Sequence, residues 1–289
     1  MKTLLASLLA VMCAASAAAG TYGPYTQETY KSCGPATARI AAVLIHGGAW
    51  FPVKQYSNTV DKVCSFLGAR NIYVVAIDYR PATVAPWPGQ LQDAQLAVRW
   101  LRHNSVARSV GVIGLSSGGQ VALSTAFQTR ISYARTDPGN EVNLLTSVSS
   151  HPDFVVDVSG PTDLTQADVL PKGVKALTAG TGMPASAAAA FASPIVHITT
   201  LTSPLFISHG TEDDIVPISQ PDSLVDALQE AGVSAFTMDS GSGPIVTPPA
   251  NATVVYDRHP GKHLFGGARE GLILGEIYNF ISSRSASVP

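Results

Sequence analysis

The chain has 289 residues, of which 46% are hydrophobic and 13% are charged, and its formal net charge is -2 at pH 7. This composition excludes an intrinsically disordered chain and predicts a globular protein with a large apolar core. The near-neutral charge and the lack of any cluster of Lys and Arg argue against nucleic-acid binding.

The N-terminus has the pattern of a secretory signal peptide. One lysine precedes an apolar run, which gives way to small residues that end in an Ala-x-Ala pattern. We therefore expect a signal peptide over residues 1–19 and a single domain over residues 20–289, secreted to the extracellular space or the periplasm. The apolar run is too short for a permanent membrane anchor, so none is expected. A lipoprotein modified at Cys13 is a weaker alternative, because Met12 stands where a small residue is favoured.

Two cysteines follow this segment, Cys33 and Cys64. An even pair in an oxidising compartment favours a disulfide that closes a loop of about 30 residues, and two buried free thiols are the alternative. Asn251 begins the one Asn-x-Thr sequence of the chain, a glycosylation site that is usable only if the secreting cell glycosylates its proteins.

Six short apolar runs recur along the chain, each followed by a polar or helical stretch. Their apolar residues do not alternate with polar ones, which is typical of strands buried on both faces of a parallel sheet. The predicted strands are Ile40–His46, Ile72–Asp78, Val110–Ser116, Phe154–Ser159, Pro204–Gly210 and Ala252–Asp257.

Helical patterns lie between these runs. The expected helices are one with Leu91, Ala94, Val98 and Leu101 on its apolar face, one over Ser223–Gly232, one over Arg269–Ser283 and, over the sheet edge, one in the Ala-rich segment Gly180–Pro194. Strands that alternate with helices predict an α/β fold, a doubly wound and mostly parallel sheet with helices on both faces.

A serine lies between two glycines where the third apolar run gives way to a helix. Gly114, Ser116 and Gly118 fit the pattern G-x-S-x-G, in which a sharp strand-to-helix turn lifts the serine hydroxyl off the sheet. Glycine is needed at both flanks because neighbouring backbones approach closely there. The same turn aims the amide of Ser117 at a bound oxyanion. Ser116 is therefore the predicted nucleophile, and a plain helix entry is the alternative reading.

The sequence HGGAW, residues 46–50, follows the first apolar run. Its glycines let backbone N–H groups turn inward, where they can donate to the negative oxygen that develops during acyl transfer. A turn with no chemical role is the alternative.

A nucleophilic serine needs a base, and the base needs an orienting carboxylate. The loop after one late apolar run offers Glu212, Asp213 and Asp214 as the carboxylate. The loop after the last run offers His259 and His263 as the base. Both loops follow strands, where the loops of an open α/β sheet carry chemistry.

From Tyr22 to its end the chain resembles the secreted and hormone-sensitive-lipase-like branches of the α/β-hydrolase superfamily, which include feruloyl- and acetylxylan-esterase-like enzymes. The stretches that carry the resemblance are HGGAW, VVAIDYRPA, WPGQLQDAQLAVRWLR, GLSSGGQVAL, VSGPTDL, SPLFISHGTEDDIVP and HPGKHLFGG. The resemblance implies the α/β-hydrolase fold for the domain. It also implies a catalytic triad of Ser116, Asp213 and His263.

The resemblance further assigns an oxyanion hole to the backbone amides of Gly48, Ala49 and Ser117. Two positions depart from the family pattern, which often has a third glycine at residue 49 and an alanine at residue 117. Ala49 adds a β-carbon beside the acyl pocket. Three other residues match the family and are interpreted as a structural polar cluster: Asp78, Arg80 and Asp93.

These features predict a secreted serine hydrolase that cleaves carboxylic esters through an acyl-enzyme and uses no cofactor. No metal is expected, because His46, His209 and His263 lack the spacing of paired ligands. One alternative is an amidase, arylformamidase or peptidase with the same triad. A non-catalytic binding protein of the same fold is another, although pure binding needs no base behind a hydroxyl.

The expected substrate is a small-molecule or polysaccharide-linked ester with a short or aromatic acyl group. No large lid region is evident, and the segments Gln128–Pro152 and Gly180–Pro194 are expected to shape the acyl and alcohol pockets. The segment Asp239–Asn251 is expected to be a loop. The sequence leaves the oligomeric state open.

Overall fold

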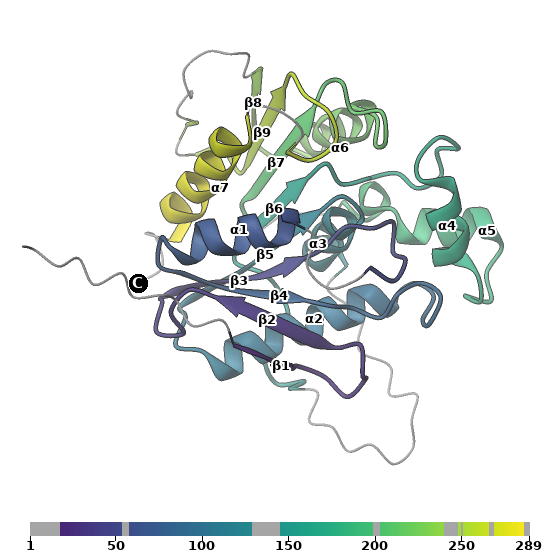
Figure 1. Ribbon diagram of the computed structural model, residues 1–289. Coiled ribbons are helices and arrows are strands. Elements are labelled where there is room, and N and C mark those ends of the chain that lie inside the picture. Colours follow the sequence, from purple (N-terminus) through teal and green to yellow (C-terminus); the bar gives the residue numbers. More distant parts are fainter. Residues whose placement is uncertain are drawn as a thin grey trace, which may run out of the picture.

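The computed structural model describes residues 18–53, 58–128, 145–198, 203–239, 248–249, 251–265 and 269–285, and within them nine strands form one sheet. The spatial order of the strands is β1-β2-β4-β3-β5-β6-β7-β9-β8 (Figure 1). The pairings of β1 with β2 and of β2 with β4 are antiparallel, and the other adjacent pairs are parallel. The strands are β1 (Ala19–Thr21), β2 (Thr29–Cys33), β3 (Ile40–Ile45), β4 (Ile72–Ile77), β5 (Ser109–Leu115), β6 (Val155–Val158), β7 (Leu205–Gly210), β8 (Ala235–Asp239) and β9 (Val254–His259).

Helices connect the strands and cover both faces of the sheet. They are α1 (Asn58–Gly68), α2 (Gly89–Asn104), α3 (Ser117–Phe127), α4 (Pro171–Thr178), α5 (Ala185–Ala192), α6 (Ser219–Glu230) and α7 (Glu270–Ser285), with a short 3-10 helix η1 (Pro194–His197). No helix in the described ranges is both long enough and apolar enough to cross a membrane.

Each face of the sheet has its own apolar core, because successive residues of a strand point to opposite sides. Val43 in β3 packs in the core that α2, α3 and α6 cover, and its neighbour Leu44 packs in the core that α1 and α7 cover. Figure 1 shows α1 and α7 together on one face. The predicted doubly wound α/β-hydrolase fold is confirmed.

The predicted elements are present with small shifts of their ends. The six predicted strands correspond to β3, β4, β5, β6, β7 and β9, and three of the predicted helices correspond to α2, α6 and α7. The Ala-rich segment forms the predicted helix, α5. Its last residue lies beside α3, where the Gln120 side-chain amide donates to the Ala192 carbonyl at 2.7 Å.

A disulfide joins Cys33 at the end of β2 to Cys64 in α1, across a sequence separation of 31. On the chain-entropy model, closing a loop of this length stabilises a fold by about 3–4 kcal/mol. The bond fastens the antiparallel edge of the sheet to the helix that covers it. Of the predicted signal peptide, residues 1–17 lie outside the described residues, and Ala19 begins β1.

A tight turn joins β5 to α3 and holds Ser116 at φ 53° and ψ -123°. A residue with a β-carbon adopts such a positive φ only when its surroundings enforce it. The Ser116 amide donates to the Val158 carbonyl at 2.8 Å, which ties the turn to the next strand. A β-carbon on Gly118 would collide with the carbonyl oxygens of Ile45 and His46. Glycine at this flank is therefore a steric requirement of the turn.

Asp157 lies beside the first turn of α3, near the end of β6, and is 0% exposed. Burial raises the pKa of this carboxyl to about 7, although His209 and the Gly160 amide act in the opposite direction. The carboxyl therefore stays protonated in the folded chain at pH values where it has ionised in the unfolded chain.

Gly118→Ala is predicted to lower the free energy of unfolding by about 2 kcal/mol or more, because the added carbon has to displace the backbone of β3. Gly275→Ala in α7 is the matched control, since no described atom lies within 4 Å of its added carbon. The control is expected to leave stability unchanged or to raise it by up to about 1 kcal/mol, because alanine favours helix. Urea denaturation measures both effects, and equal stabilities would contradict the close approach of α3 and β3.

The pKa of Asp157 predicts how its substitution changes stability with pH. A carboxyl whose folded pKa is raised contributes stability that is present below its unfolded pKa, near 4, and is lost as the pH rises to about 7. The amide of the Asp157→Asn variant does not ionise, so the variant does not lose this stability as the pH rises. The variant is expected to gain up to about 4 kcal/mol relative to wild type between pH 4 and pH 7, and to gain nothing more above it. Denaturation curves across this range measure the difference, and a difference that does not vary with pH would contradict the assignment.

Candidate active site

Three side chains from separate loops meet at the carboxyl edge of the parallel strands. His263 Nε2 lies 2.8 Å from Ser116 Oγ, and His263 Nδ1 lies 2.7 Å from Asp213 Oδ2. Ser116 follows β5, Asp213 follows β7 and His263 follows β9. With Nδ1–H donating to the carboxylate, Nε2 is the acceptor that faces the serine hydroxyl.

The Asp213 carboxylate is held by donors on both of its oxygens. Oδ1 accepts the amides of Ile215 and Val216 at 2.9 Å each, and Oδ2 lies 3.3 Å from His209 Nε2 as well as next to His263. Burial alone would raise the pKa of Asp213, but the hydrogen bonds from His209, His263 and the Val216 amide hold it well below its usual range. The group is therefore a carboxylate throughout the physiological pH range, and its orientation is fixed.

The loops that carry Asp213 and His263 are bonded to each other. The amide of Thr211 donates to the His259 carbonyl at 2.8 Å, and the amide of Glu212 donates to the Gly261 carbonyl at 2.9 Å. Beyond the histidine, the amide of Leu264 donates to Ser159 Oγ at 3.0 Å. These bonds set the position of the imidazole relative to the sheet.

The other residues considered for the acid and the base lie elsewhere. Glu212 and Asp214 are exposed to solvent on either side of Asp213. His259 is buried at the end of β9. Asn251, the expected glycosylation site, is exposed.

The turn after β3 carries the amides predicted for the oxyanion hole. Gly48, Ala49 and Trp50 have φ values of 119°, 52° and 60°, so three successive residues lie in the left-handed region. Trp50 is fully buried; its indole N–H donates to Gln120 Oε1 at 3.0 Å, and its amide donates to Ser117 Oγ at 3.4 Å. The Ser117 hydroxyl thus holds this turn against α3, a contact that the alanine common in the family could not make. This contact was not predicted from the sequence.

A cavity of about 370 Å³ lies in front of the serine. Gly48, Ala49, Ser116 and His263 line it together with several aliphatic side chains. The structure thus brings four of the six residues predicted for the site to one cavity; Asp213 stands behind His263, and Ser117 follows Ser116 at the start of α3. No group of three or more side chains in the described residues is arranged to hold a metal ion.

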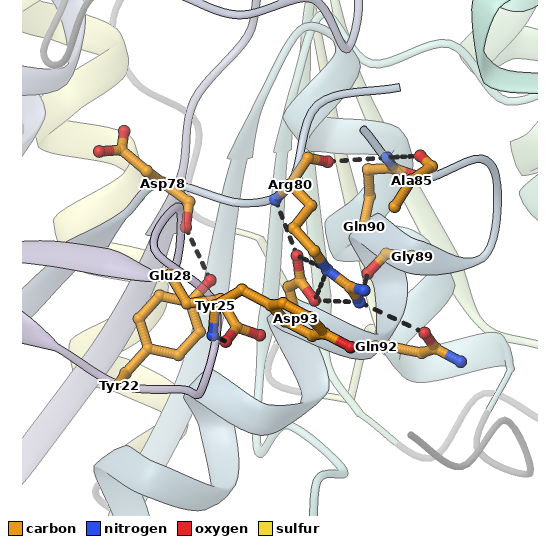
Figure 2. A network of polar contacts seen from close by, with 10 residues as sticks. All are labelled: Tyr22, Tyr25, Glu28, Asp78, Arg80, Ala85, Gly89, Gln90, Gln92 and Asp93. Carbon is orange, nitrogen blue, oxygen red and sulfur yellow. Dashed lines mark hydrogen bonds and ion pairs between the residues drawn. The ribbon is translucent and has the colours of Figure 1, made fainter. Parts of the chain in front are cut away.

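The residues interpreted as one structural polar cluster are divided between two environments. Arg80 and Asp93 form a buried ion pair, with Arg80 Nη2 2.6 Å from Asp93 Oδ1. Asp78 differs from the expectation, because its carboxylate lines the cavity in front of Ser116. Figure 2 shows the Asp78 carboxylate pointing away from the Arg80–Asp93 pair.

Sequence comparison finds relatives among esterases. The chain is 25% identical over 205 residues to the esterase LipC of Mycobacterium tuberculosis, a match that covers 65% of this chain and 47% of LipC. It is 29% identical over 111 residues to the versiconal hemiacetal acetate esterase of Aspergillus parasiticus, covering 38% of this chain and 34% of that protein. The chain therefore spans half or less of the length of these curated relatives.

Structural comparison finds the same fold in solved esterases. A truncated carbohydrate esterase from gut microbiota superimposes with a TM-score of 0.73 at 21% identity, covering 95% of this chain and 98% of that one. The esterase Est2 of Thermogutta terrifontis superimposes with a TM-score of 0.64 at 19% identity, covering 94% and 91%. The family model BD-FAE matches residues 30–228, which is more than half of the chain, and the chain belongs to the BD-FAE family.

Proposed function

We propose that this protein is a serine hydrolase that cleaves carboxylic esters through an acyl-enzyme, with Ser116, His263 and Asp213 as its catalytic triad. The observation that carries the proposal is the continuous contact from the serine hydroxyl through the imidazole to a buried carboxylate, at 2.8 and 2.7 Å. The esterase names of the relatives and structural neighbours support the same chemistry.

In the first half of the reaction, His263 Nε2 takes the proton of Ser116 as Oγ attacks the ester carbonyl carbon. The resulting imidazolium is stabilised by the Asp213 carboxylate, whose two oxygens stay fixed by other donors. His263 then gives its proton to the alkoxide oxygen as the carbon–oxygen bond breaks. The alcohol leaves, and the acyl group stays on Ser116.

In the second half, a water molecule gives a proton to His263 and attacks the acyl carbonyl carbon. His263 returns the proton to Ser116 Oγ, and the carboxylic acid leaves. In both halves the carbonyl oxygen carries negative charge for a moment. The amides of Gly48, Ala49 and Ser117 are the proposed donors to it, and the Trp50 amide ties their two turns together by donating to Ser117 Oγ at 3.4 Å.

We propose short or aromatic acyl groups as the preferred substrates. The cavity of about 370 Å³ is closed in part by aliphatic side chains such as Leu170 and Ile215, which suits a compact acyl group better than a long lipid chain. Neighbours described as a carbohydrate esterase and as an acetyl ester-xyloside hydrolase support a polysaccharide-linked ester as well as a small-molecule one.

We further propose that the protein acts outside the cytoplasm, in the extracellular space or the periplasm. The apolar N-terminal segment with its Ala-x-Ala pattern supports secretion. The bonded pair Cys33–Cys64 supports an oxidising compartment.

Ser116→Ala is predicted to lower kcat/KM for p-nitrophenyl acetate and butyrate by about 10⁴-fold or more, because the variant lacks the hydroxyl that forms the acyl-enzyme. Ser223→Ala, an exposed position on α6, is the matched control and is expected to retain wild-type activity. The wild-type rate should fall steeply from acetate and butyrate to acyl chains of lipid length. Activity that survives Ser116→Ala, or faster cleavage of anilides than of matched esters, would contradict the proposal.

A further inference from the structure

A second cavity of about 560 Å³ adjoins the one that contains Ser116. The two cavities adjoin at the lining residues that they share, His46, Val53 and Asp78, and we call the two together the depression. The second cavity extends toward the antiparallel edge of the sheet, where Thr26 contributes to its lining. A substrate held at Ser116 can therefore reach residues that take no part in the proposed acyl transfer.

The outer wall of the second cavity is a fixed loop between β1 and β2. Within this loop the Tyr25 amide donates to the fully buried carboxylate of Glu28 at 2.7 Å. The Arg80 guanidinium lies 4.3 Å from the centre of the Tyr25 ring and is itself paired with buried Asp93. Figure 2 shows the Tyr25–Glu28 contact lying beside the Arg80–Asp93 pair. These contacts hold the wall in place from within the fold.

His46, at the junction of the two cavities, presents a hydrogen-bond acceptor in a fixed direction. Its Nδ1 donates to the Gly47 carbonyl at 2.6 Å, which leaves Nε2 without a hydrogen in the neutral ring. The ring stacks on Tyr79, with centroids 4.4 Å apart and planes at 15°. Burial lowers the pKa of His46, although the Gly47 carbonyl and Asp78 act in the opposite direction, so the ring is neutral near pH 7.

Asp78 presents a second acceptor to the same point. Its Oδ2 accepts the hydroxyl of Thr29 at 2.8 Å, and Figure 2 shows its backbone carbonyl held by the hydroxyl of Tyr22, at 2.7 Å. Its Oδ1 lies 3.7 Å from His46 Nε2. Two acceptors that face each other at this distance have no hydrogen to share. Both can instead accept from a donor on a third group.

The charge on the described lining of the depression is negative. Asp78 is the single Asp, Glu, Lys or Arg among the described residues that line either cavity. A negative group on the substrate would meet this carboxylate with no cation beside it in the described lining.

We propose that His46 Nε2 and Asp78 Oδ1 form the acceptor pair of a substrate subsite that binds a hydroxyl-bearing group and rejects an anionic one. The inference rests on the proposed ester hydrolysis, because it concerns the part of the ester that lies beyond the reacting carbonyl. Hydroxyl groups are the ligand chemistry because each can donate to one of the two acceptors. The rings of Phe51 and Tyr79 in the second cavity offer apolar contact to the carbon atoms that carry those hydroxyls.

The test uses the purified protein and two matched series of esters. The first series varies the alcohol: acetyl esters of glycerol, of glycerol with its two other hydroxyls methylated, and of glyceric acid. The second series varies the acyl group: phenyl esters of 3-hydroxybutyric acid, of its methyl ether, and of succinic acid as the half ester. The two series tell which half of the substrate reaches the subsite.

In one of the two series the wild type is expected to show kcat/KM about 10-fold or more higher for the hydroxylated ester than for the methylated or the anionic one. Asp78→Asn should bring the hydroxylated and anionic esters to within about twofold of each other while phenyl acetate is still cleaved. Asp226→Asn, which removes the same charge from an exposed position on α6, should retain the wild-type ratios. Ratios near one in both series of the wild type, or ratios that Asp78→Asn leaves unchanged, would overturn the proposal.

Binding to the Ser116→Ala protein separates this inference from the proposed reaction. NMR titration of the same esters into this variant is expected to give the same order of affinity, with the hydroxylated ester tightest and the anionic ester weakest. If the wild type cleaves no ester, the proposed function fails, and this order of affinity still decides whether the subsite exists. If esters are cleaved but bind without this order, the subsite alone is overturned.

Discussion

The contact between the Ser116 hydroxyl and His263 Nε2 is the interaction on which the site depends. It joins residues that are 147 positions apart in the chain, and it forms because β5 and β9 end at the same edge of a parallel sheet. Neither side chain can reach the other unless two local conditions hold. The turn after β5 must keep Ser116 in its strained conformation, and the loop after β9 must be bonded to the loop after β7. Backbone hydrogen bonds at the sheet edge meet much of both conditions.

The apolar runs and the glycine spacing were sufficient to predict the parallel core of the fold and the turn at Ser116. The strands that the sequence analysis did not predict are β1, β2 and β8, and they differ from the predicted ones in a physical way. β1 and β8 are the edge strands and β2 lies next to β1, and all three are short strands with partly exposed residues, so they lack the continuous apolar runs of strands buried on both faces. The helix α1 was also missed, although Val60, Val63, Cys64 and Leu67 have the spacing of a buried helical face.

Site residues could be predicted from the sequence only where few residue types can perform the chemical role. A serine at the turn and a histidine after the last strand belong to this class. The choice among Glu212, Asp213 and Asp214 depends on which side chain turns inward, and the sequence decided it by resemblance alone. Asp78, by contrast, was not predicted to lie in the site. The parallel pairing of β3 with β4 puts Ile45 opposite Ile77 and so brings His46 and Asp78 together. The carboxylate is held by the β1–β2 hairpin, whose Tyr22 and Thr29 bond to Asp78, and that hairpin was absent from the sequence prediction.

His263 is the group that is proposed to turn the Ser116 hydroxyl into a nucleophile, and formation of a covalent phosphate ester on the serine reports this step directly. The purified protein is incubated with diethyl p-nitrophenyl phosphate, the release of p-nitrophenol is timed, and the modified peptide is identified by mass spectrometry. We expect one diethyl phosphate group per chain, carried by Ser116, and a rate that falls by about 10²-fold or more in His263→Ala. Modification at another residue, or an equal rate in His263→Ala, would contradict it.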